Sequence, residues 1–362
     1  MRGPCEQTAG PVTTASLFGV VHAAVDTVSL AILYNEVATR RLADGEIFRL
    51  FLLYNCVAFG LQLPLGWLCD LYERYRPAAV IGLLCTTAAT LLHSTFPHLG
   101  VVCVGVGNAL YHVGAGAMVL RESAGRATPA GIFVAPGAFG VWLGVQLGAR
   151  GFDHQGLWAA GLLMAAILVA QRRPHQMVIS RPCAAAVRIV LLLSVSVALR
   201  SFLGGWISGS WSGTSTAVWI VLAAVCGKTA GGVIADRVGW RATAVTALVL
   251  LVPLVVPATQ HRPLAVASSL LVQVTMAVTL VAVYLAMPAR PGTAFGFPSL
   301  AILLGALPDL TGHFPAEIRP WLPVVALFSA ALLFRGLGQA GSRMPGACRS
   351  PVPAHERLTS PP

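Results

Sequence analysis

A series of apolar segments repeats along nearly the whole chain, and each has about the length that a helix needs to cross a lipid bilayer. Such a helix takes about 20 mostly apolar residues. Twelve segments meet this rule, over residues 14–38, 47–70, 77–95, 98–120, 129–149, 155–171, 187–210, 214–235, 241–258, 263–287, 293–311 and 320–340. The pattern predicts an all-α polytopic membrane protein with about twelve transmembrane helices. Segment 241–258 contains Pro253 and Pro257 and is, with segment 155–171, the weakest of the set.

The composition excludes a soluble globular domain. Of the 362 residues, 56% are hydrophobic and only 10% are charged, whereas soluble domains carry about 25% charged residues. The surplus apolar surface is expected to face the lipid bilayer. The formal net charge of +11 does not indicate a nucleic-acid partner, because the arginines are scattered over short loops and do not form one basic face.

The chain divides near its midpoint. Most connections between segments are short, but residues 172–186 are polar, basic and proline-containing. We predict an N-terminal six-helix bundle over 1–171, a cytoplasmic basic linker over 172–186, a C-terminal six-helix bundle over 187–340 and a disordered cytoplasmic tail over 341–362. Basic residues concentrate in the even-numbered loops, in the linker and in the tail. The positive-inside rule therefore places both termini in the cytoplasm of a multi-pass protein of the cell membrane.

Two loops half a chain apart share one layout. Gly66 and Asp70 lie at the end of the second apolar segment and Arg74 follows it, and a fuller copy lies at the end of the eighth. The residues of that second copy are Gly232, Asp236, Arg237, Gly239 and Arg241. Small residues allow two helices to approach closely, and an acid with nearby arginines suits a loop that opens and closes. Because Leu71 and Glu73 interrupt the first copy, we expect Asp70 to matter less than Asp236.

Polar residues inside the apolar segments mark a candidate pathway. His22 and Asp26 are four residues apart and share one helix face with Ser29. A mid-membrane carboxylate must pair, take up a proton or face water, so a function in proton transfer is favoured over a pair that only locks helix packing. His112, which shares a face with Asn108, could carry a proton or be a buried packing histidine.

Two further polar side chains belong to the predicted pathway. Asn55 either lines the same cavity or bridges two helices. Arg200 lies deep in the seventh segment, where it either holds an anionic group or forms a static ion pair. The fifth segment contains Pro136 and then a ridge of small residues, which predicts close helix packing. The glycines of that ridge are Gly137, Gly140, Gly144 and Gly148.

No cofactor and no metal site is expected. The eight cysteines form no CxxC pair, and neither an HExxH zinc pair nor a GxSxG elbow is present, so the sequence does not indicate an enzyme. The phosphate-binding GxxxxGK[ST] pattern is also missing. Any uphill transport is therefore expected to draw on an ion gradient.

Twelve helices, a midpoint linker and the paired loops resemble the major facilitator superfamily, whose loop motif reads G-x-L-a-D-R-x-G-R-R/K. Within it, the first half is similar to fosmidomycin-resistance-type exporters. Those carry an H-x-x-x-D stretch in helix 1, matched by His22 and Asp26, and a G-x-G-x-A-x-F/Y-H stretch in helix 4. Gly105, Gly107, Ala109, Tyr111 and His112 match the latter, whereas Val113 replaces a proline.

The resemblance implies two six-helix bundles around one cavity and export of a small molecule against entering protons, by alternating access. We expect the protein to act as a monomer. The alternative is a transporter-like sensor or scaffold without transport activity, and substrate flux into proteoliposomes would distinguish the two.

Overall fold

The computed structural model describes residues 10–39, 44–152, 154–172, 186–312 and 316–341. The predicted linker lies almost wholly outside these ranges, as does the predicted tail beyond residue 341. All regular structure in the described ranges is helical. The helices run in the following order: α1 (Pro11–Thr39), α2 (Asp44–Asn55), a π-helical turn (Cys56–Gly60), α3 (Gln62–Tyr72), α4 (Tyr75–Leu92), α5 (Pro97–Glu122), α6 (Ala127–Ala149), α7 (Gln155–Ala170), α8 (Ala186–Gly209), α9 (Thr216–Val238), α10 (Trp240–Leu251), a 3-10 turn (Pro257–Thr259), α11 (Arg262–Val274), α12 (Met276–Ala286), α13 (Pro291–Leu310), a 3-10 turn (Ala316–Trp321) and α14 (Leu322–Gly341).

The described helices include ten that are long and apolar enough to cross a membrane. The two remaining predicted segments correspond to α7 and α10, which are shorter apolar helices. Helix α10 ends at Leu251, seven residues before the predicted end, since Pro253 and Pro257 cannot supply the amide hydrogens that a continuing helix needs. Two predicted segments are also interrupted, by the π-helical turn before α3 and at Thr275 between α11 and α12.

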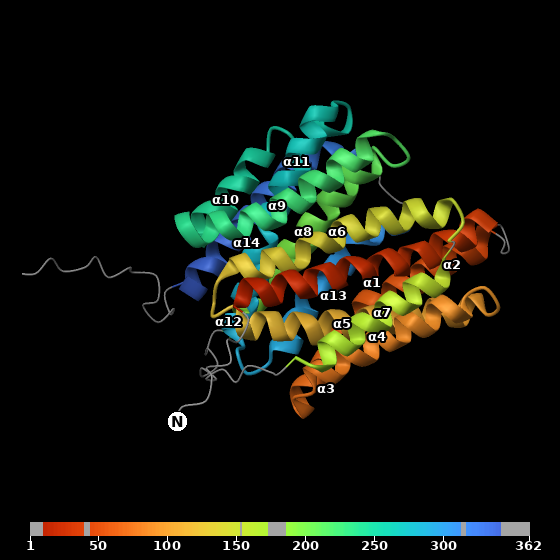
Figure 1. The fold of residues 1–362 in the computed structure, drawn as a ribbon. Coiled ribbons are helices and arrows are strands. Elements are labelled where there is room, and N and C mark those ends of the chain that lie inside the picture. The colour runs from red at the N-terminus through yellow and green to blue at the C-terminus, as the bar shows by residue number, and fades with distance from the viewer. Residues whose placement is uncertain (1–9, 40–43, 153, 173–185, 313–315, 342–362) are drawn as a thin grey trace, which may run out of the picture.

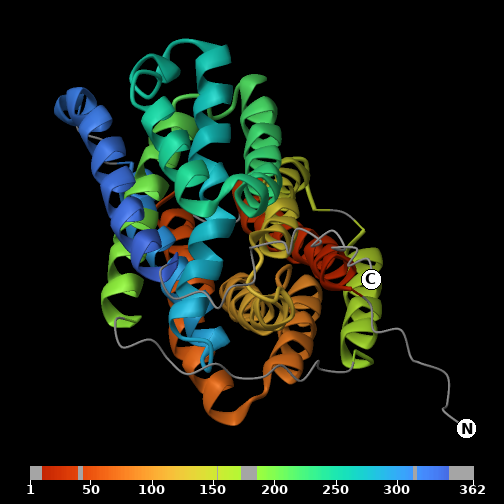
Figure 2. The same cartoon turned by 90° about the vertical axis from the view of Figure 1, so that its left-hand side faces the viewer.

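The helices form two groups that meet along α6, α9, α3 and α13 (Figure 1). Helix α6 packs on α1 in its own group and on α9 across the junction, and α13 packs on α8 in its own group and on α3 across the junction. The view turned by 90° shows α13 crossing from the C-terminal helices to the N-terminal ones (Figure 2).

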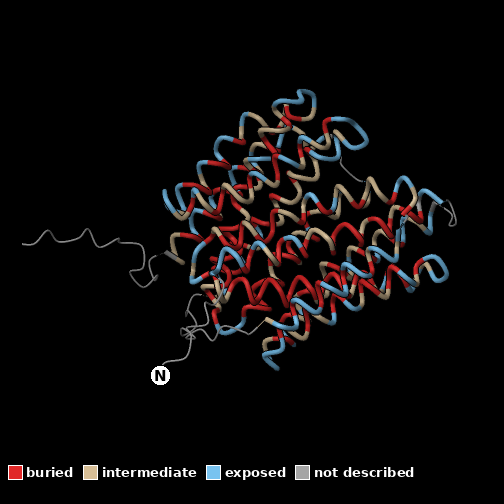
Figure 3. Tube along the Cα trace, in the orientation of Figure 1, coloured by how far each residue is buried: buried red, intermediate tan, exposed pale blue. Residues whose placement is uncertain are grey.

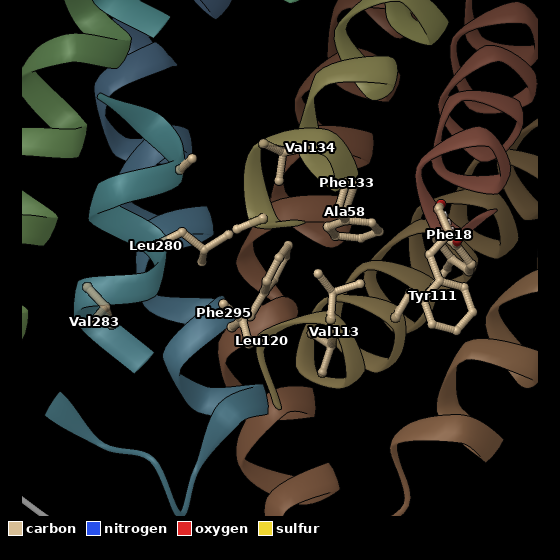
Figure 4. Packing of buried hydrophobic residues seen from close by; sticks show 14 of the residues in the cluster. Phe18, Ala58, Tyr111, Val113, Leu120, Phe133, Val134, Leu280, Val283 and Phe295 are labelled. Carbon is tan, nitrogen blue, oxygen red and sulfur yellow. Dashed lines mark hydrogen bonds between the residues drawn. The ribbon is translucent and has the colours of Figure 1, made fainter. Parts of the chain in front are cut away.

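Burial follows this arrangement. Buried residues concentrate where the two groups meet, and exposed ones lie along the outer faces and loops (Figure 3). Large apolar side chains on the outer faces are exposed, as expected for helices that contact lipid. Examples are Trp67, Leu71, Leu157, Val187, Trp219 and Phe328. At the junction, Phe133, Val113 and Phe295 gather with Leu280 in one apolar cluster (Figure 4).

Helices α1 and α6 touch backbone to backbone along the glycine ridge. A Cβ atom at Gly140 would lie 2.9 Å from Ala23 Cα, and one at Gly144 would lie 2.8 Å from Leu30 Cβ. At Gly148 it would meet Tyr34 Cβ at 2.7 Å. Because lipid offers no hydrophobic drive for helices to associate, such close approach supplies the dispersion contact that holds them together.

We predict that Gly144→Ala destabilises the protein by about 1–3 kcal/mol, the usual cost of overpacking. The added methyl group would collide with α1, where the nearest atoms include the backbone carbonyl oxygen of Thr27. Gly161→Ala is the matched control, since a Cβ there has no atom within 4 Å. Thermal unfolding of the detergent-solubilised variants measures the difference, and equal melting temperatures would contradict the packing role.

Candidate functional site

A cluster of buried polar side chains lies between α1 and α5. His22 and Asp26 extend from α1, and Asn108 and His112 extend from α5. The Nε2 atoms of His22 and His112 are 2.7 Å apart. Asp26 Oδ2 lies 3.1 Å from His22 Nε2, and Asp26 Oδ1 lies 3.7 Å from His112 Nε2. The structure therefore brings together three of the residues that the sequence placed on a pathway.

Asn108 and Ser29 fix the orientation of the carboxylate. The Asn108 amide donates to Asp26 Oδ1 at 2.8 Å and approaches Ser29 Oγ at 3.4 Å. The exposed fractions of the cluster side chains are small, at 5% for His22, 7% for Asp26 and 8% for His112. A buried carboxylate with this many polar neighbours is stabilised only if the cluster as a whole is satisfied.

The hydrogen bonds determine which nitrogen of each imidazole carries a proton. His22 Nδ1 lies 2.9 Å from the carbonyl oxygen of Phe133, and His112 Nδ1 lies 2.8 Å from that of Asn108. A carbonyl oxygen only accepts, so both Nδ1 atoms must be donors and both Nε2 atoms of the neutral rings carry lone pairs. The Nε2 lone pairs of His22 and His112 thus converge with a carboxylate oxygen of Asp26. Because the three acceptors repel one another, a proton or a cation between them is required to make their close approach favourable.

Helix α6 leaves the space that the cluster occupies. A Cβ atom at Gly137 would lie 2.6 Å from His22 Cε1 and 2.7 Å from Asp26 Oδ2. Pro136 precedes this glycine inside the helix, and its ring leaves a carbonyl of the preceding turn without its usual amide donor. Gly137, noted in the sequence only as a packing element, therefore borders the polar cluster directly.

The second half of the chain contributes neighbours to the cluster that the sequence did not indicate. The ring centroid of Phe295 in α13 lies 6.5 Å from that of His112 and 6.1 Å from that of Phe133. Lys228 of α9 donates from Nζ to the carbonyl oxygen of Val134 at 3.4 Å. Val134 directly follows Phe133, whose carbonyl oxygen lies 2.9 Å from His22 Nδ1. An ordinary apolar pattern gives no signal for Phe295, whereas a lysine within the eighth apolar segment is a signal that sequence reasoning missed.

Arg200 and Asn55 lie apart from this cluster. The Arg200 side chain is buried, with 4% of the residue exposed, and it donates to the Ser196 carbonyl, Thr275 Oγ1 and Thr279 Oγ1. Among the described residues no carboxylate lies within 4.0 Å of it. Asn55 donates to the Phe51 carbonyl of its own helix at 2.8 Å, so its amide satisfies local backbone.

We predict that Arg200→Met leaves the melting temperature within a few degrees of wild type. Loss of one partner of a buried ion pair costs about 3–5 kcal/mol, but the described residues give Arg200 only neutral partners. Binding of an anionic compound should be lost in the same variant. A large fall in melting temperature would show that a carboxylate pairs with this guanidinium.

Asp70 joins the two halves at one end of the molecule. It lies near the end of α3, and its carboxylate accepts the backbone amides of Gly292 at 2.8 Å and Thr293 at 2.7 Å, both in the first turn of α13. The hydroxyls of Thr293 and Tyr75 also donate to it, at 2.6 and 2.9 Å. A carboxylate at this position satisfies unpaired amides and matches the positive end of the helix dipole.

Asp236 makes the equivalent contact in the other direction. Its carboxylate accepts the backbone amides of Ala127 and Thr128, each at 2.8 Å, in the first turn of α6. The Thr128 hydroxyl donates at 2.6 Å, Trp240 Nε1 at 3.1 Å, and Arg126 Nε lies 4.0 Å away. The two carboxylates thus have matching partners, and the contacts provide no reason for Asp70 to matter less than Asp236.

The glycines of the two loop motifs are points of helix contact. A Cβ atom at Gly232 would lie 2.7 Å from the Ala127 carbonyl oxygen, and one at Gly292, opposite Gly66, would lie 2.6 Å from the Gly66 carbonyl oxygen. Gly239 has φ = 112°, a conformation that suits glycine at the end of α9.

The arginines of the loop motifs contribute less than expected. Arg74 and Arg237 are exposed. Arg241 places its guanidinium carbon 3.2 Å from the ring centroid of Phe334 in α14. Each capping carboxylate is therefore satisfied mainly by the helix terminus of the opposite half, and among these three arginines none carries an ion pair to it in the described structure.

Comparison with known proteins identifies the fold. No protein-family model and no curated protein matches the sequence, but solved transporter structures match the architecture. A bacterial homologue of the iron transporter ferroportin, in an outward-facing state, gives a TM-score of 0.68 at 12% identity over 92% of this chain and 100% of its own. The E. coli fucose:proton symporter FucP gives 0.65 at 10% over 92% and 99%. The human organic anion transporter MFSD10 gives 0.63 at 16% over 93% and 100%.

Proposed function

From its major facilitator fold, we propose that this protein is a secondary active transporter that moves a small molecule by alternating access, with proton-coupled export as its mode. The observation that carries the proposal is the matched pair of carboxylate contacts, Asp70 to α13 and Asp236 to α6. Each joins one half of the chain to the other, and both lie at the end of the molecule that holds the even-numbered basic loops.

We call these two contacts the latch. It consists of Asp70 with the first turn of α13 and Asp236 with the first turn of α6. If the basic loops are cytoplasmic, the latch closes the cytoplasmic side and the structure corresponds to an outward-facing state. Opening that side separates each carboxylate from its helix terminus, so the latch sets the energy difference between the two states. By the same rule the proposal has both termini in the cytoplasm. It further takes the protein to be a monomer in the cell membrane.

We predict that Asp70→Asn and Asp236→Asn each loosen both helix termini to a similar extent. The loss of a capping carboxylate costs about 0.5–2 kcal/mol. Because one opening motion breaks both contacts, hydrogen–deuterium exchange should accelerate at residues 127–128 and 292–293 in either variant. Glu73→Gln, an exposed acid beside the first loop, is the control and should change neither segment. Acceleration confined to the mutated cap would show two independent helix caps and no latch.

Proton coupling is assigned to the His22–Asp26–His112 cluster. A proton held between the two Nε2 atoms would relieve the repulsion of their lone pairs, and Asp26 would stabilise the resulting positive charge. Proton coupling is also the property of the structurally similar fucose:proton symporter. Export is supported by the sequence resemblance to fosmidomycin-resistance-type exporters.

A short physical connection links this cluster to the latch. Phe295 lies two residues after Thr293, which Asp70 caps, and the same phenylalanine ring packs beside His112. A Cβ atom at Gly116 would lie 3.0 Å from Phe295 Cγ, so α5 leaves little room around this ring. Movement of α13 on release of Asp70 therefore displaces the Phe295 ring, which lies beside His112. In the proposed mechanism this displacement couples opening of the latch to protonation of the cluster.

We predict that Asp26→Asn keeps substrate exchange but loses uphill transport driven by a pH gradient. Asparagine mimics the protonated acid, so the substrate site persists while the change in proton occupancy is lost. A thermal-shift screen of the purified protein supplies the test compound, since a ligand that binds the folded state raises its melting temperature. Asp309→Asn, an exposed carboxylate in α13, is the matched control and should retain uphill transport.

The outcomes of this experiment also separate the alternative function. Accumulation against a gradient by Asp26→Asn would make Asp26 a packing residue and move the coupling site elsewhere. Wild-type protein that binds a compound without any flux in proteoliposomes would favour a transporter-like sensor or scaffold. An anionic compound is the first to screen, because Arg200 is buried among neutral oxygens and a similar structure belongs to an organic anion transporter.

A further inference from the structure

We infer that His22, Asp26 and His112 form a binding site for a divalent transition-metal ion of the zinc or iron(II) kind. The sequence contains neither a CxxC pair nor an HExxH pair, so no metal was expected from it. The inference goes beyond the proposed transport and does not depend on it, because metal binding is measured on purified protein without any gradient.

The three side chains place their donor atoms at the spacing that a metal requires. Metal–nitrogen and metal–oxygen bonds of about 2.1 Å at tetrahedral angles put neighbouring donors roughly 3.4 Å apart. The observed separations are 2.7 Å between the two Nε2 atoms, 3.1 Å from His22 Nε2 to Asp26 Oδ2 and 3.7 Å from His112 Nε2 to Asp26 Oδ1. One ligand atom from each residue lies within 4.8 Å of the other two, so only small side-chain movements are needed.

The surroundings hold each donor in the form that binds a metal. Both imidazoles direct Nδ1 at a backbone carbonyl, of Phe133 and of Asn108, which leaves both Nε2 lone pairs pointing into the cluster. Metal-binding histidines commonly donate their second ring nitrogen in this way. Asn108 likewise holds Asp26 through one carboxylate oxygen. The neighbours thus direct both Nε2 lone pairs into the cluster, and Asp26 turns Oδ2 toward His22 while its Oδ1 accepts from Asn108.

The donor types indicate the class of ion. Two imidazoles and one carboxylate suit zinc, iron(II), cobalt(II) and related ions, whereas magnesium and calcium prefer oxygen ligands alone. Three protein donors leave further coordination positions open, as in sites that exchange their contents. A metal binds these groups only in their deprotonated form, so ion and bridging proton would occupy the same place in turn.

A second buried histidine–carboxylate pair shows by contrast what distinguishes the cluster. His93 Nδ1 lies 3.4 Å from Glu36 Oε1, but this pair supplies only two groups. The exposed fractions of His93 and Glu36 are 0% and 1%, so an ion could not reach them. In the cluster, all three residues remain slightly exposed.

The nearby positive charge of Lys228 gives the inference an independent test. Its Nζ donates to the carbonyl oxygen of Val134, the residue after Phe133, whose own carbonyl oxygen lies against His22 Nδ1. A positive charge from the other half of the chain therefore lies beside the cluster. A lysine here opposes a bound cation. Lys228→Gln should therefore bind metal more tightly than wild type without any change in the metal ligands.

The experiment is a titration of detergent-purified, tag-free protein with Zn²⁺ by calorimetry, and with Co²⁺ followed by its visible spectrum. Wild type should bind one ion per chain, with a Co²⁺ spectrum typical of mixed nitrogen and oxygen ligands. His112→Gln and Asp26→Asn should weaken binding at least tenfold, and Lys228→Gln should strengthen it. His98→Gln, at an exposed histidine, is the matched control and should bind as wild type does.

Absence of saturable binding in wild type, or an affinity that His112→Gln leaves unchanged, would overturn the inference. If His112→Gln does not give a monodisperse protein, Lys228→Gln decides, and equal affinity in that variant would count against the site. If the protein binds no metal, pH-driven flux can still be observed. If it shows no pH-driven flux, metal binding can still be measured, so the two conclusions can be told apart.

Discussion

Close contact between helix backbones, made possible by glycine, is the constraint on which the rest of this structure depends. Helices in lipid gain little from burying apolar surface against each other, so their association relies on dispersion and on short approach distances. The same glycines that allow it also place polar groups. Gly137 leaves room for His22 and Asp26 beside α6, and Gly232 brings α9 near enough to α6 for Asp236 to reach its first turn.

The second constraint is the cost of burying polar groups. Unpaired backbone amides and charged side chains are expensive away from water, so each must find a partner. The first turns of α6 and α13 obtain theirs from Asp236 and Asp70 in the opposite half. A local capping residue could have satisfied these amides, but here the partner comes from the opposite half of the chain. In the proposed transport cycle this contact would break when the halves move apart.

The polar cluster differs from these satisfied contacts because its centre contains only acceptors. His22 and His112 have both committed their Nδ1 protons to carbonyl oxygens, and Asp26 adds a carboxylate. Such a site is stabilised by whichever cation occupies it, a proton or a metal ion. The His112 ring of this site lies beside Phe295 in α13, the helix whose first turn Asp70 caps. In the proposed function this proximity couples the cation bound at the cluster to the opening of the latch.

Features that depend on local spacing could be predicted from the order of the amino acids alone. Apolar length predicted the membrane helices, a four-residue interval put His22 and Asp26 on one face, and a run of glycines marked the ridge of α6. Tertiary packing, by contrast, sets which groups meet across helices. It paired His22 with a histidine 90 residues further along, gave each loop aspartate a helix terminus as partner, and left Arg200 among neutral oxygens. Such pairings depend on crossing angles and helix depth, which no short-range pattern encodes.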